Sequence, residues 1–180
     1  MSLSRFSLVA AAALFLSACA STAKGPGPLS VVDRVDVARY AGRWYEIARY
    51  QHVFERDVVG AAAEYSLKPD GTISVINSGF KKTLDGKYTS IQGTARVPDV
   101  SKPGRLKVRF FGPFEADYLI FGLDADSYSW ALVGSDNRKY LWFLARTPTI
   151  GDAVFERMKT IARAQGYSLD ELYKVPQKER

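Results

Sequence analysis

The stretch that decides the fold is Tyr40-Ala41-Gly42-Arg43-Trp44-Tyr45-Glu46-Ile47-Ala48-Arg49. Its aromatic and β-branched residues favour a strand over residues 43–50. Alternate side chains of a strand share a face, so Trp44, Glu46 and Ala48 are predicted to point inward together. A carboxyl on an apolar face needs a partner or a raised pKa. Glu46 is therefore either a structural hydrogen-bonding group or a polar contact for a ligand headgroup or water.

Seven more short β-rich runs lie outward from this stretch, separated by turn signals such as Lys68-Pro69-Asp70-Gly71. Short strands at this spacing are typical of an all-β barrel or sandwich. No internal repeat and no long low-complexity run interrupts them, so the chain is expected to form one domain. The predicted runs are 60–68, 72–79, 88–97, 105–111, 117–123, 129–134 and 140–146.

The alternation within these runs predicts a hollow interior. Small residues such as Ala63 and Gly93 fall on the inner face, whereas a barrel filled by its own side chains would favour bulky ones. An eight-stranded barrel is about the size that holds one small ligand. The run 129–134 is apolar on both faces and gives no orientation. The residues predicted to line the interior are Ala48, Ala63, Tyr65, Ile73, Val75, Asn77, Ile91, Val108, Phe110, Tyr118 and Trp142.

One helix is predicted over residues 151–165, with its apolar side buried against the outside of the β-structure. Thr149 and Asp152 approximate a capping box at its start, and Gly166 is a stop signal at its end. The predicted apolar stripe is Val154, Met158, Ile161, Ala162 and Gln165.

The N-terminus carries a targeting signal. Arg5 precedes the apolar run 6–16, which is shorter than the roughly 20 residues a membrane span needs. Small residues then precede Cys19, the only cysteine, an arrangement that resembles a bacterial lipoprotein signal. The resemblance implies that residues 1–18 are removed and that Cys19 is acylated. Residues 19–30, rich in Gly and Pro, are predicted to be a flexible tether, and residues 31–180 the folded domain.

Composition excludes several function classes. Lys and Arg number 25 against 19 Asp and Glu, and the resulting net charge of +6 is spread along the chain, so no nucleic-acid partner is expected. One Cys and one His exclude an internal disulfide, a cysteine zinc site and a multi-histidine metal site. No nucleophile-elbow, zinc-protease or P-loop motif is present. We therefore expect no enzyme activity, no metal and no cofactor.

Two motifs together resemble the lipocalin family. Gly42 to Ala48 (GRWYEIA) is similar to the first lipocalin motif, and Tyr140 to Pro148 (YLWFLARTP) is similar to the third. The segment Gly122 to Tyr128 occupies the place of the second, with Leu123 and Ala125 departing from it. The resemblance implies an eight-stranded antiparallel up-and-down β-barrel, a calyx with the helix packed outside. It also implies a closed base built by Gly42, Trp44 and Arg146, where the guanidinium of Arg146 covers the indole of Trp44.

With the lipoprotein signal, the resemblance points to bacterial outer-membrane lipocalins, similar to plant temperature-induced lipocalins and apolipoprotein D. It implies a lipid-anchored protein at the outer membrane, facing the periplasm, that stores or transports fatty acids or lysophospholipids for membrane maintenance under stress. The alternative is a surface interaction lipoprotein with a filled barrel. A homodimer is left open. His52, in the loop predicted at the open end, is either a solvated residue or, with Arg49 and Arg56, a contact for an anionic headgroup.

Overall fold

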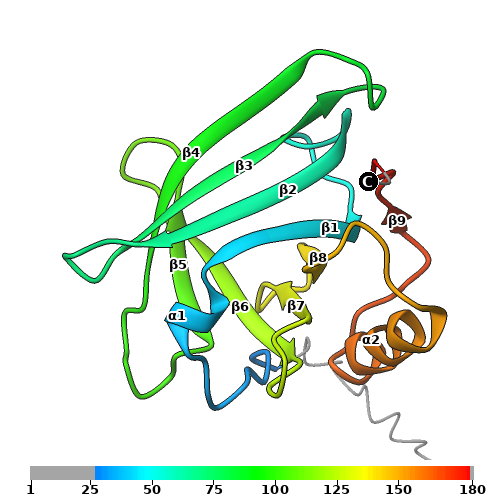
Figure 1. Cartoon of the computed structure of the whole chain (residues 1–180). Helices are drawn as coiled ribbons and strands as arrows, with labels where there is room; N and C mark the ends of the chain where they lie inside the picture. Colours follow the sequence, from blue (N-terminus) through cyan, green and yellow to red (C-terminus); the bar gives the residue numbers. More distant parts are fainter. Residues whose placement is uncertain (1–26, 179–180) are drawn as a thin grey trace, which may run out of the picture.

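The structure, a computed structural model, describes residues 27–178 and shows one β-barrel with a helix on its outside (Figure 1). The signal sequence and Cys19 lie outside the described residues, as does most of the tether. The strands are β1 (Gly42–Tyr50), β2 (Val58–Leu67), β3 (Ile73–Lys81), β4 (Tyr88–Arg96), β5 (Arg105–Arg109), β6 (Ala116–Leu123), β7 (Trp130–Gly134), β8 (Leu141–Ala145) and β9 (Leu172–Lys174). The helices are α1 (Val37–Tyr40) and α2 (Asp152–Ala164).

The barrel closes because β1 pairs antiparallel with both β2 and β8. Each strand from β1 to β8 pairs with its neighbour in sequence, and all these pairs are antiparallel. This confirms the predicted eight-stranded up-and-down barrel with a C-terminal helix. Short β9 pairs antiparallel with Ala48–Tyr50 at the end of β1, beyond the residues that pair with β2, and was not predicted. In such a topology the β1–β2, β3–β4, β5–β6 and β7–β8 connections all lie at one end of the barrel, and the others at the opposite end.

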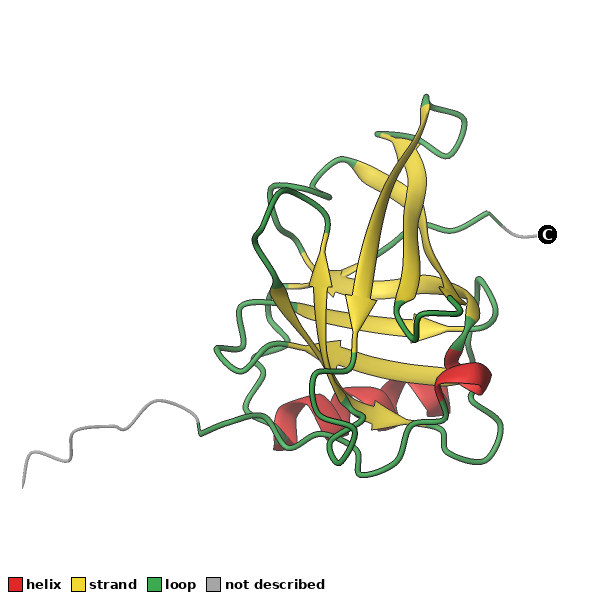
Figure 2. Cartoon of the chain, turned by 90° about the vertical axis from the view of Figure 1, so that its left-hand side faces the viewer, coloured by secondary structure: helices red, strands yellow, loops and turns green. Residues whose placement is uncertain are grey.

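Two large apolar cores and a small cluster of Val58, Ala61 and Val175 hold the described residues together. The inner core fills the base of the barrel and includes Trp44, Ile120 and Leu144. The outer core lies between the barrel wall and α2, where Phe143 packs against Phe155 and Met158 is fully buried. Figure 2 shows α2 lying across one side of the strands.

Strand β7 contributes to both cores, which explains its lack of a polar face. Ala131 and Val133 lie in the inner core, whereas Trp130 and Leu132 lie in the outer one beneath α2. A strand covered on both faces is expected to be apolar throughout, so its sequence could not give its orientation.

A bulge in β1 overturns one predicted position. Glu46 pairs with Leu144 but Ala48 pairs with Phe143, so β1 carries one extra residue at Ile47. Such a bulge reverses the inward and outward alternation beyond it. Ala48 therefore lies in the outer core against α2, and the prediction that it lines the interior is wrong.

The start of α2 also differs from the prediction. Its N-cap is Gly151, which makes no side-chain capping bond, and the carbonyl of Thr149 accepts a hydrogen bond from Thr147 instead. The Thr149–Asp152 capping box is therefore wrong. The end agrees with the prediction, because Gly166 has a φ of +85°, a left-handed conformation that favours glycine after a helix.

Candidate functional site

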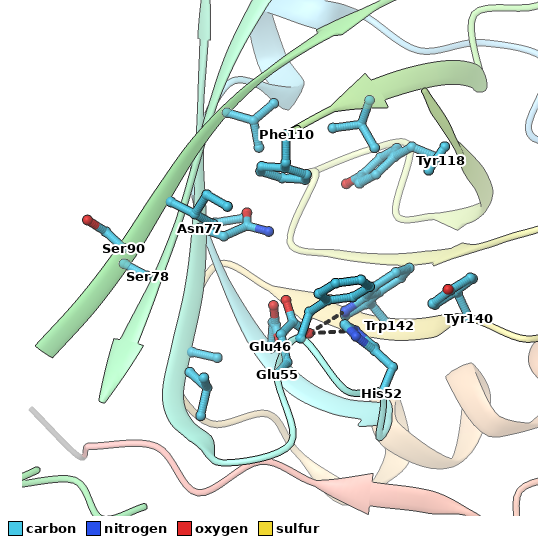
Figure 3. A pocket seen from close by; sticks show the side chains of 18 of the residues that line it. Glu46, His52, Glu55, Asn77, Ser78, Ser90, Phe110, Tyr118, Tyr140 and Trp142 are labelled. Atoms are coloured by element: carbon cyan, nitrogen blue, oxygen red, sulfur yellow. Dashed lines mark hydrogen bonds and ion pairs between the residues drawn. The ribbon is translucent and has the colours of Figure 1, made fainter. Parts of the chain in front are cut away.

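A cavity of about 690 Å³ occupies the part of the barrel farther from Trp44, which we call the upper part (Figure 3). Its volume lies within the range of roughly 300–1,000 Å³ found for small-molecule sites. It is open at the end where the β1–β2 and β5–β6 connections meet, since Phe54 and Phe114 on its wall are 67% and 80% exposed. The part of the chain that the structure describes thus contains a barrel that is hollow above its base.

Nine of the eleven residues predicted to line the interior border this cavity. Ile73 does not, because it lies below the layer formed by Tyr65 and Tyr118, next to a void of only about 20 Å³. Ala48 is excluded by the β1 bulge. The nine are Ala63, Tyr65, Val75, Asn77, Ile91, Val108, Phe110, Tyr118 and Trp142.

The cavity floor is made by three tyrosines. The hydroxyl of Tyr118 lies 2.8 Å from that of Tyr40 and 2.9 Å from that of Tyr65. Burial raises the pKa of all three phenols, so they remain neutral and satisfy one another's hydrogen bonds. A buried hydroxyl without a partner would be costly, and each of these three hydroxyls has a partner in this cluster.

Below the floor, Trp44 and Arg146 close the barrel. The guanidinium carbon of Arg146 lies 3.9 Å from the centroid of the Trp44 ring. Arg146 also donates to the carbonyls of Arg39, Tyr40 and Arg43, which ties α1 to the first strand. Gly42 begins that strand with a φ of +91°, and a Cβ there would lie 3.4 Å from Arg146. α1, which was not predicted, covers this end.

A buried charged cluster lies in the wall between floor and mouth. Arg49, with no exposed surface, donates to the Glu46 carboxylate at 2.9 Å and to the carbonyls of Glu55 and Val58. Arg49 therefore fastens the β1–β2 connection to the barrel. Burial, together with the nearby Glu55 carboxylate, raises the pKa of Glu46 to about 8 despite its pairing with Arg49.

Glu55 joins this cluster to the cavity. Trp142 donates its indole N–H to a Glu55 oxygen at 3.2 Å, and His52 Nε2 lies 2.9 Å from the same oxygen (Figure 3). Burial by itself would raise the pKa of Glu55, but His52, Arg49 and Trp142 outweigh it and hold that pKa below its usual range. Neither interpretation of His52 holds: its side chain is only 14% exposed, so it is not a solvated loop residue, and a carboxylate beside the imidazole and the burial of Arg49 oppose an anionic-headgroup contact.

Two parts of the site were missed by sequence reasoning. The first is Glu55, whose loop position gives no sign that it folds back into the cavity wall. The second is the aromatic rim, which we define as Phe54, Phe111 and Phe114 at the cavity mouth. Aromatic residues at 54 and 114 in predicted loops, and at 111 at the end of a predicted strand, were a signal that could have indicated it.

The comparisons agree with this geometry. A family model described as a lipocalin-like domain matches residues 35–177. The outer membrane lipoprotein Blc of Vibrio cholerae is 37% identical over 92% of this chain and 98% of its own length. Temperature-induced lipocalin-1 of Arabidopsis thaliana is 37% identical over 83% of each chain. Insecticyanin of the tobacco hornworm Manduca sexta has the same fold, with a TM-score of 0.68 at 20% identity over 87% of each chain.

A closed eight-stranded antiparallel barrel with an open apolar cavity defines a calyx protein. With the family match over residues 35–177, the chain belongs to the lipocalin-like family. Within residues 27–178, no helix is both long and apolar enough to cross a membrane.

Proposed function

We propose that this protein is a membrane-anchored carrier that holds a fatty acid or lysophospholipid in its cavity. The observation that supports this proposal is the cavity of about 690 Å³, whose walls are mainly apolar and include Val75, Ile91, Val108 and Phe110. Burying a methylene gains about 0.8 kcal/mol, so a 16-carbon chain gains on the order of 10 kcal/mol before association costs. The filled-barrel alternative is contradicted by the open cavity.

The proposed location is the outer membrane, on its periplasmic side. A relative that covers nearly the whole chain is named an outer membrane lipoprotein, and the lone Cys19 stands where a lipoprotein signal needs it. Two or more acyl chains on Cys19 give stable anchoring, whereas one gives only marginal binding. A carrier held at a bilayer is suited to storing or moving lipids during membrane stress.

The proposed mechanism is partition between membrane and cavity, and no bond is made or broken. The acyl chain lies along the apolar wall, with its end toward the Tyr65–Tyr118 floor. Its headgroup lies at the level of Glu55, Trp142 and Tyr140, where the wall carries polar atoms.

The test is a titration of delipidated protein with lysophosphatidylcholines of increasing chain length while tryptophan fluorescence is followed. Trp142 borders the cavity, whereas Trp44 lies below the floor and the side chain of Trp130 packs in the outer core. A saturable change is therefore expected in wild type and lost in Trp142→Phe. Affinity is expected to rise about tenfold for each two methylenes added. No saturable change, together with no copurified lipid in native mass spectrometry, contradicts the proposal.

A further inference from the structure

The aromatic rim is unusual because its rings are exposed. Phe54, Phe111 and Phe114 are 67%, 62% and 80% exposed, and they are the only exposed phenylalanines among residues 27–178. Adjacent Val53 is 73% exposed. A continuous exposed apolar patch marks an interaction site more often than scattered single residues do.

Two of the rings meet across the mouth. Phe54 comes from the β1–β2 connection and Phe111 from the β5–β6 connection, yet their ring centroids lie 6.5 Å apart. Phe54 also approaches the ring of His52 at 6.0 Å. The rings therefore border the cavity and are exposed at that end of the barrel.

The described chain begins on the outside of the barrel wall, beside the β7–β8 connection and the start of β5, where Arg105 donates to the carbonyl of Leu29. Arg138 donates to the carbonyl of Gly27, and Asp136 accepts from the backbone of Leu29. Both side chains belong to the β7–β8 connection, which also carries Tyr140 on the cavity wall. Cys19 precedes Gly27 by eight residues, which span at most about 28 Å.

We propose that the aromatic rim docks on the lipid bilayer, so that the cavity mouth opens directly against the membrane surface. The proposal rests on the membrane anchoring given above, since an acylated Cys19 would keep the barrel, its mouth included, within reach of the bilayer. The three rings enter the boundary between headgroups and acyl chains, where the apolar faces of interfacial elements carry Trp, Phe and Leu. The cargo then exchanges between leaflet and cavity without crossing water.

A second copy of the chain is the less suitable occupant. A fully exposed aromatic side chain presents about 150–250 Å², so the three partly exposed rings offer roughly 400 Å² in total. A stable protein interface needs about 800 Å² from each partner. The rim is thus about half the size a dimer requires, whereas bilayer insertion has no such threshold and the anchor already supplies proximity.

The first experiment uses residues 20–180, which keep every described residue but lack the lipid anchor. Binding to vesicles of three parts phosphatidylethanolamine to one part phosphatidylglycerol is measured by sedimentation. Phe54→Ser/Phe111→Ser/Phe114→Ser is expected to lower the partition coefficient at least about tenfold. The matched control, Leu67→Ser/Ile76→Ser/Val100→Ser, replaces exposed apolar residues outside the rim and is expected to bind as wild type. Circular dichroism checks that each variant is folded.

The second experiment uses the full-length acylated protein in vesicles containing brominated lipid. Phe111→Trp is expected to add a fluorescence component that bromine quenches, and Val100→Trp, on the β4–β5 connection at the opposite end, is not. Equal quenching of the two, or a rim variant that partitions like wild type, overturns the proposal. Wild type that is dimeric while the rim variant is monomeric, with equal vesicle binding, assigns the rim to a second copy instead. Lysophospholipid binding without vesicles tests the carrier function separately, and it can succeed while docking fails.

Discussion

The guanidinium carbon of Arg146 lies 3.9 Å from the centroid of the Trp44 ring, and its N–H groups reach the carbonyls of Arg39, Tyr40 and Arg43. Trp44 is fully buried and donates its own N–H to Tyr40. One arginine thus connects the last strand, the first strand and α1.

We predict that Arg146→Ala destabilises the protein by about 2–4 kcal/mol, because it removes a cation–π contact and several charge-assisted hydrogen bonds. Arg146→Lys is expected to recover only a minor part, since an ammonium cannot reach several carbonyls while covering a ring. Urea unfolding measures both. Arg34→Ala, an exposed arginine on the N-terminal segment, is the control and should change little. Equal effects of Arg146→Ala and Arg34→Ala would contradict the assigned role.

The tyrosine floor gives a second stability prediction. Tyr118→Phe removes the hydroxyl that links Tyr40 and Tyr65 and leaves two buried hydroxyls without that partner. We expect a loss of about 1–3 kcal/mol in the free energy of unfolding. Tyr88→Phe, at an exposed position, should be neutral. If Tyr118→Phe were also neutral, the hydroxyl cluster would not stabilise the floor.

The raised pKa of Glu46 predicts a pH dependence. The folded pKa of about 8 lies above the ordinary value of 4.5, so protonated Glu46 contributes stability that is complete below about pH 4.5 and is lost as the pH rises through about 8. Glu46→Gln removes this loss. Urea unfolding at about pH 5 and about pH 9 should show the stability of Glu46→Gln rising relative to wild type at the higher pH. A difference between the two proteins that does not change with pH is the opposing result.

Filling the cavity should abolish ligand binding while the fold persists. Val108 is only partly buried and borders the cavity, so Val108→Trp has open space to occupy. We predict at least about a tenfold loss of lysophospholipid affinity with circular dichroism unchanged. Val100→Trp, at an 88% exposed position, is the size-matched control and should bind as wild type. Retained binding by Val108→Trp would place the ligand outside this cavity.

Much of the barrel could be predicted because strand alternation and turn chemistry are local. The eight strands and α2 follow from such patterns. Arg146, which joins the last strand of the barrel to the first, lies beside Trp44 as its motif implied. Ala48 was misplaced because a bulge at Ile47 is decided by pairing with β8, which a single strand's sequence does not contain.

The charged cluster was beyond local patterns for a related reason. Arg49 looks like the polar end of a strand and Glu55 like a loop residue, yet Arg49 is buried beside the Glu46 carboxylate, and Glu55 folds back to within 3.6 Å of Arg49. Burial of a charge depends on its partner, and partners six residues apart across a loop leave no periodic signal. Ile73 was assigned to the correct face, but alternation gives a face and not a depth, so the floor above it could not be foreseen.

The seal made by Trp44 and Arg146 has a kinetic consequence. Because the Trp44 end is closed, a ligand enters and leaves through the same opening, and a bound ligand blocks the entry of another. The exchange rate is then limited by dissociation of the bound ligand and does not rise with the concentration of a competing ligand.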